Sequence, residues 1–110
     1  MATRSFICKQ FSGTGKVRGV YCHFDGYPEG VGQTLIDCYN NDTIVNQLLE
    51  LGALSSLGRT LADTIAYHRD RGDDLEVEEF DNLEAAREYA RFDVGAEYMY
   101  IWDGVHWTGY

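Results

Sequence analysis

GVYCHFDGYPEGVG, residues 19–32, is the stretch from which the expected fold is built. Apolar and polar side chains alternate along residues 20–25, and a period of two is typical of a β-strand with one apolar face. Beyond the strand, Pro28 holds a fixed φ and Gly30 accepts dihedral angles that other residues avoid, which favours a turn over residues 27–30. The stretch therefore predicts a strand that runs directly into a tight loop.

The segments on both sides of this stretch alternate between strand and helix patterns. Apolar side chains at spacings of three and four indicate helices. Asp42 or Thr43 is positioned to cap the second of them, and Asn82 to cap the third. Asp103-Gly104 lies between two aromatic segments and is typical of a two-residue hairpin connection. The expected elements are strands over 5–11, 17–25, 64–68 and 75–80, helices over 31–39, 44–51 and 82–92, a connector over 53–60, turns over 12–16 and 69–72, and a hairpin over 97–110.

Together these elements predict one α+β domain over residues 1–110. We expect an antiparallel sheet of four to six strands that contains an N-terminal and a C-terminal hairpin, with two to three helices packed on one face. An exposed aromatic hairpin at the C-terminus is also a natural edge for a homodimer.

The negative charge of the chain lies in its second half. Residues 1–60 carry five basic and five acidic side chains, whereas residues 61–110 carry four basic and thirteen acidic ones, so the net charge of −9 belongs to the second half. Such a field repels nucleic acid and favours basic partners, including proteins that themselves bind nucleic acid. The charge also fits the simpler role of keeping a small protein soluble.

Hydropathy and cysteine spacing indicate a cytoplasmic protein. The sequence has no apolar run of about 18 residues, which predicts no membrane contact, and its N-terminus lacks the pattern of a secretory signal. The three cysteines, Cys8, Cys22 and Cys38, are odd in number and widely spaced. They predict buried free thiols in a reducing compartment rather than disulfides or a zinc site.

Polar side chains of the 19–32 stretch and of a later basic cluster form a candidate ligand site. Two arginines in that cluster are suited to clamping an anion, with an aromatic ring of Tyr27, Trp102 or Trp107 stacked on the ligand. Arginines two residues apart point the same way only if their segment is extended. The candidate ligand-binding residues are Tyr21, His23, Asp25, Tyr27, Glu29, His68, Arg69 and Arg71.

Two reactive interpretations of the same residues stay open. His23, Asp25 and His68 are of the types that bind a metal ion. Alternatively, one of the two histidines pairs with a carboxylate for acid–base chemistry, with Cys22 or Cys38 as a nucleophile. We assign no catalytic residue, metal ligand or cofactor from the sequence.

Four segments of the chain resemble a family of small proteins encoded by phages and prophages. The resemblance extends from about residue 17 to the end of the chain, and its YCHxDGYP and RDRG motifs are specific to the family. The segments are YCHFDGYPE (21–29), LGALSSLG (51–58), YHRDRG (67–72) and EYMYIW (97–102). The resemblance implies a phage protein that occupies a surface on a host defence complex, as anti-CRISPR proteins do.

The resemblance and the charge lead to one expected function and two alternatives. We expect a non-enzymatic inhibitor that binds a host defence protein of the CRISPR type and does not bind nucleic acid directly. The expected partner-binding residues are acidic: Asp73, Asp74, Glu76, Glu78 and Glu79. The first alternative is a sponge that binds a nucleotide signal or another small anion through the 21–29 loop with Arg69 and Arg71. The second is a small metal-dependent enzyme.

Overall fold

The fold is built on a central antiparallel pair, β1 (Ser5–Gln10) and β2 (Val17–Cys22), in a computed structural model that describes residues 2–109. Ile7 lies opposite Val20 in the register of this hairpin. Its loop closes through the Phe11 N–H, which donates to the Lys16 carbonyl at 2.8 Å. The hairpin predicted from the sequence is confirmed, although its second strand ends at Cys22 rather than at residue 25.

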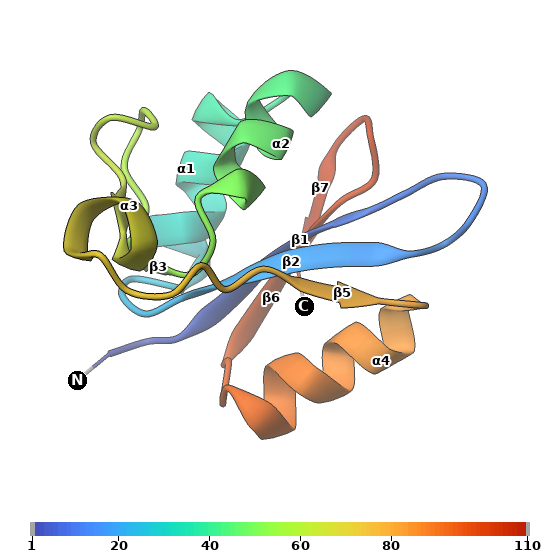
Figure 1. Cartoon of the computed structure of the whole chain (residues 1–110). Coiled ribbons are helices and arrows are strands. Elements are labelled where there is room, and N and C mark those ends of the chain that lie inside the picture. The colour runs from blue at the N-terminus through green and yellow to red at the C-terminus, as the bar shows by residue number, and fades with distance from the viewer. Residues whose placement is uncertain (1, 110) are drawn as a thin grey trace.

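Within residues 2–109 the chain continues from this hairpin into four α-helices, two π-helical turns and five further strands, and Figure 1 shows their arrangement. In order, these elements are the π-helical turn η1 (Pro28–Gly32), α1 (Gln33–Cys38), α2 (Asp42–Glu50), β3 (Leu54–Ser56), β4 (Ile65–Ala66), α3 (Tyr67–Arg71), β5 (Glu78–Phe80), α4 (Leu83–Glu88), the π-helical turn η2 (Tyr89–Asp93), β6 (Tyr98–Trp102) and β7 (Trp107–Gly109).

The sheet is mixed, not antiparallel, and has seven strands rather than four to six. Its order is β4-β3-β2-β1-β6-β7, and β5 pairs with the first half of β2. The β1–β6 and β2–β3 pairs are parallel. The parallel pairs were missed because each joins segments far apart in the chain, whereas the two hairpins that suggested an antiparallel sheet join neighbours.

Helices cover both faces of the sheet, which corrects the prediction of one covered face. Figure 1 shows α1 and α2 on one side and α4 on the other. The reason lies in β1, where Ile7 faces the α1–α2 side and both Phe6 and Cys8 face the α4 side, all three completely buried. A strand that is apolar on both faces needs a cover on each.

The sequence predicts the positions of the helices more accurately than the residues at which they begin and end. The cap of α2 is Asn41, whose Oδ1 accepts from the Ile44 N–H at 3.0 Å, rather than Asp42 or Thr43. The predicted cap of α4 is confirmed, because the Asn82 Oδ1 accepts from the Ala85 N–H at 2.8 Å.

Three other local predictions differ from the structure. The 53–60 connector contains a strand, β3, and the 69–72 turn is the second part of a helix, α3. The C-terminal hairpin turns through residues 103–106 instead of two residues, because the Asp103 carboxylate accepts the N–H groups of Val105 and His106 and stabilises a wider loop. Among residues 2–109, no helix is long and apolar enough to cross a membrane.

Candidate functional site

Most carboxylates of the second half lie in one continuous segment, residues 73–97, which supplies one strand of the sheet and the helix on one of its faces. Residues 73–97 contain ten acidic side chains and two basic ones, and they form β5, α4, η2 and the segments around them. We call this surface the acidic face. All of its carboxylates are exposed except that of Glu78, which is partly buried: Asp73, Asp74, Glu76, Glu78, Glu79, Asp81, Glu84, Glu88, Asp93 and Glu97. The five predicted partner-binding residues all belong to it.

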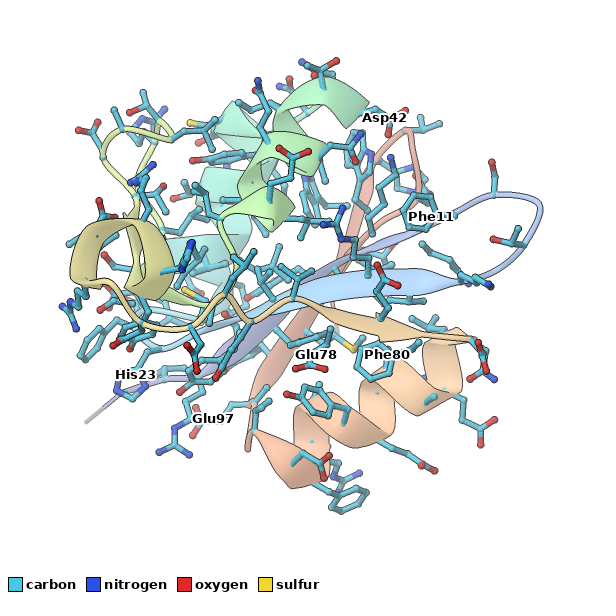
Figure 2. All side chains as sticks on the ribbon, viewed as in Figure 1. Phe11, His23, Asp42, Glu78, Phe80 and Glu97 are labelled. Atoms are coloured by element: carbon cyan, nitrogen blue, oxygen red, sulfur yellow. The ribbon has the colours of Figure 1, made fainter. Side chains whose placement is uncertain are left out.

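Strand β5 belongs to the sheet and carries the central residues of the acidic face. It pairs antiparallel with β2, so that Glu78 lies opposite Gly19 and Glu79 opposite Arg18. Phe80 anchors it, because its ring lies 6.1 Å from the ring of Phe6 and 5.3 Å from the ring of Tyr89. Figure 2 shows Phe80 and Glu78 both directed from β5 toward α4. The alternation that buries Phe80 therefore turns the Glu78 carboxylate toward the helical layer.

A cavity of about 240 Å³ opens beside Glu78, between the sheet and η2. We call it the Tyr21–Tyr89 cavity. Burial raises the pKa of the Tyr89 phenol, and the charge of Glu78 and the hydrogen bond to it raise it further. Burial also raises the pKa of Tyr21, against an opposing effect of the Arg4 charge. The residues that line the cavity are Phe6, Tyr21, Ala53, Glu76, Glu78, Tyr89 and Val94.

The structure thus joins members of two groups that the sequence analysis kept apart. Tyr21 comes from the predicted ligand set, and Glu76 and Glu78 come from the predicted partner set. Tyr89, which also lines the cavity, belongs to neither predicted set. A signal for it was present, because Tyr89 follows Ala86 by three residues on the buried side of the 82–92 helix.

The other residues of the 21–29 loop mainly hold the loop together. The Tyr21 hydroxyl and the His23 Nδ1 are 2.6 Å apart, and the Tyr27 hydroxyl donates to Asp25 at 3.4 Å. The Gly26 carbonyl accepts from the Tyr100 hydroxyl at 2.6 Å, and a Cβ at Gly26 would lie 2.7 Å from the Thr3 carbonyl oxygen. The motif therefore shapes a turn that is packed against β1 and β6, while Glu29 is exposed.

Arg69 is committed to the protein's own backbone. Its guanidinium donates to the carbonyls of Leu61, at 2.9 Å, and of Thr64, and it also pairs with Asp70 at 3.0 Å. That hydrogen bond from Arg69 is the main reason that the pKa of Asp70 lies below its usual value. The Arg69 guanidinium thus ties α3 to the 61–64 segment.

Arg71 and His68 do not complete an anion clamp with Arg69. Residues two apart on a helix point in different directions, and α3 is helical at both arginines. The Arg71 guanidinium lies over the Tyr67 ring at 5.3 Å, and the His68 Nδ1 lies 2.7 Å from the Asp73 carbonyl oxygen. The clamp hypothesis requires an extended backbone at the two arginines, whereas residues 67–71 are helical.

Trp102, Trp107 and Cys22 are held by contacts inside the fold. Of the other groups considered for stacking and nucleophilic chemistry, Cys38 is partly buried and Tyr27 is exposed. The indole N–H of Trp102 donates to Asp42 at 2.8 Å, and that of Trp107 donates to the Tyr39 carbonyl at 2.7 Å. Cys22 is completely buried, and burial raises the pKa of its thiol to about 12, so thiolate is scarce at neutral pH. Within residues 2–109, no three His, Cys, Asp or Glu side chains are grouped as a metal site requires.

Comparison with known proteins finds no family model that matches this chain, and no curated protein or solved structure with significant similarity to it. Its function is therefore inferred from the chemistry of the acidic face and the Tyr21–Tyr89 cavity.

Proposed function

We propose that this protein is a phage-encoded, non-enzymatic inhibitor of a host defence protein of the CRISPR type, acting in the host cytoplasm. In this proposal the acidic face covers a basic surface on which the defence protein binds nucleic acid. The observation that carries the proposal is the concentration of ten carboxylates, nine of them exposed, and only two guanidinium groups in residues 73–97. The phage setting comes from the YCHxDGYP and RDRG resemblance.

The negative charge of the acidic face favours a partner with a positively charged surface. A surface with a strong excess of one charge attracts the opposite surface over several ångströms and accelerates association. A nucleic-acid groove is lined with lysine and arginine, because phosphate contacts supply most of its affinity. An acidic face competes for that groove and itself repels nucleic acid.

The rigidity of the acidic face also supports a binding role. Strand β5 is hydrogen-bonded to β2, and the rings of Phe6, Phe80 and Tyr89 pack between the strand and the helix. The backbone that carries Glu78 and Glu79 is therefore already ordered before a partner arrives, which reduces the entropy that binding would cost.

The test is competition with DNA on a purified CRISPR-type effector complex. We expect the wild-type protein to displace labelled DNA, and to do so less well as NaCl increases, because salt screens charges on exposed surfaces. Glu76→Gln/Glu78→Gln/Glu79→Gln should weaken displacement about tenfold or more, equivalent to at least about 1.4 kcal/mol.

A matched control variant distinguishes the effect of the acidic face on displacement from the effect of total net charge. Glu29→Gln/Asp37→Asn/Glu50→Gln removes the same charge from exposed positions outside residues 73–97 and should change displacement less than about threefold, since distant exposed charges are largely screened. Equal losses in the two triple variants, or no displacement by the wild type from a panel of such complexes, would contradict the proposal.

A further inference from the structure

We propose that the Tyr21–Tyr89 cavity receives the side chain of an arginine from the bound protein. This inference rests on the proposed function and specifies its anchoring contact. The cavity combines the partly exposed aromatic rings of Tyr21 and Tyr89 with the carboxylates of Glu76 and Glu78. Arginine is the side chain that stacks on aromatic rings and also pairs with carboxylates through a planar fork of N–H donors.

The lining divides into parts that suit the two halves of an arginine side chain. Ala53 and Val94 are apolar and offer a surface to the aliphatic stem. Glu78 is partly buried and its charge raises the pKa of Tyr89, whereas Glu76 is exposed. A guanidinium in the cavity would therefore meet a carboxylate held by the fold and another near solvent. Arginine side chains that insert into a pocket are among the residues that contribute most to the binding energy of protein interfaces.

Size argues against a larger ligand. Pockets that bind small molecules usually occupy about 300–1,000 Å³, whereas this cavity measures about 240 Å³. A single side chain suits that volume better than a nucleotide does. The two carboxylates would also repel a phosphate group.

One cation of the chain lies close to the cavity and opposes the proposed ligand. The charge of Arg4 affects the Tyr21 phenol, and the Arg4 Nη1 lies 3.2 Å from the position that a Cβ at Gly95 would occupy. Glu76 and Glu78 together outweigh this single positive charge. Removing the Arg4 charge should therefore strengthen arginine binding, while removing the carboxylates should weaken it.

The experiment is an NMR titration of the full chain with N-acetyl-arginine amide, followed through the aromatic signals of Tyr21 and Tyr89. We expect saturable shifts of these two rings. N-acetyl-citrulline amide has nearly the same shape without the charge and should cause no saturable shift. Shifts spread evenly over the acidic face, or equal responses to both probes, would overturn the proposal.

Three variants should change the affinity for N-acetyl-arginine amide in different directions. Glu76→Gln/Glu78→Gln should weaken the apparent affinity for N-acetyl-arginine amide about tenfold, since hydrogen bonds to charged groups contribute about 1.5–3 kcal/mol. Arg4→Gln should strengthen binding at least about twofold, because like charges repel at short range. Glu84→Gln/Glu88→Gln removes two carboxylates from the acidic face that do not line the cavity and should leave the affinity within about twofold of the wild type.

The titration contains no partner protein, so its outcome is independent of the DNA-competition test. If Glu76→Gln/Glu78→Gln does not fold, the sign of the Arg4→Gln effect still decides the matter, and a weaker affinity in Arg4→Gln would overturn the proposal. Absence of saturable shifts with DNA displacement intact would reject the cavity alone. Saturable shifts without DNA displacement would support the cavity and reject the proposed function.

Discussion

Gly19 of β2 is closely packed against the buried side chains on the α4 side of the sheet. A Cβ added there would lie 2.5 Å from the Phe6 Cε2 and 2.7 Å from the Cys8 Cβ, and both side chains are completely buried. We expect Gly19→Ala to lower the free energy of unfolding by about 1–3 kcal/mol, because a well-packed core has no space for another methyl group. Urea unfolding measures this. In the control Gly109→Ala the nearest atom would be 3.5 Å away, and equal losses would contradict the packing argument.

At the scale of elements, Asp42 ties the start of α2 to the sheet. Its Oδ1 accepts from the Trp102 indole N–H of β6 at 2.8 Å and lies 3.3 Å from the Lys9 Nζ of β1; Figure 2 labels Asp42 beside the upper helices. Lys9 itself is nearly buried and also donates to the Asn46 Oδ1 at 3.1 Å. The hydrogen bond from Trp102, and then the one from Lys9, hold the pKa of Asp42 below its usual value.

This lowered pKa predicts a specific loss of stability in acid. A carboxyl group with a lower pKa in the folded state stabilises the fold above its unfolded pKa, and that contribution disappears as the pH falls through the folded value. We expect the free energy of unfolding to fall as the pH drops below about 4, and to fall less in Asp42→Asn. Urea unfolding across this range measures the effect. Glu50→Gln, at the other end of α2, should keep the wild-type profile; identical profiles for all three proteins would contradict the prediction.

At the scale of the whole molecule, one-sided charge should make stability depend on salt. The net charge is −9, and like charges on the acidic face repel one another across solvent. We expect the midpoint of urea unfolding to rise between about 0.02 and 0.5 M NaCl, because screening acts within about 10 Å at 0.1 M. Asp73→Asn/Asp74→Asn/Glu76→Gln should show a smaller rise. A falling midpoint would mean that exposed ion pairs such as Arg18–Glu79 outweigh the repulsion.

The elements that could be predicted from the sequence are those with a local signal. The β1–β2 hairpin, the helical spacing of α2 and the Asn82 cap of α4 depend on side chains a few residues apart, and all three predictions are confirmed. The three residues of β3 are too few for a period of two to be recognised, whereas β4 lies within the predicted 64–68 strand, whose last two residues begin α3 instead. Their pairing comes from the sheet beside them.

Part of the candidate site could also be predicted. The acidic residues at 73–79 were found because charge is read directly from composition. The functional interpretation of Arg69 was not supported by geometry, because nothing in the sequence shows that its guanidinium binds the backbone of residues 61–64. The role of Tyr89 required the position of β5 relative to η2, which no local pattern contains.

By itself, the sequence determined the α+β class, the two hairpins, the helices that carry long apolar stripes and the one-sided charge. Each depends on the chemistry of residues that are neighbours along the chain. Only the tertiary structure decided the parallel β1–β6 and β2–β3 pairs, the covering of both sheet faces and the meeting of Tyr21, Glu78 and Tyr89 around one cavity. The physical reason is that these contacts join residues tens of positions apart, where burial of both faces of β1 and β2, rather than local preference, selects the arrangement.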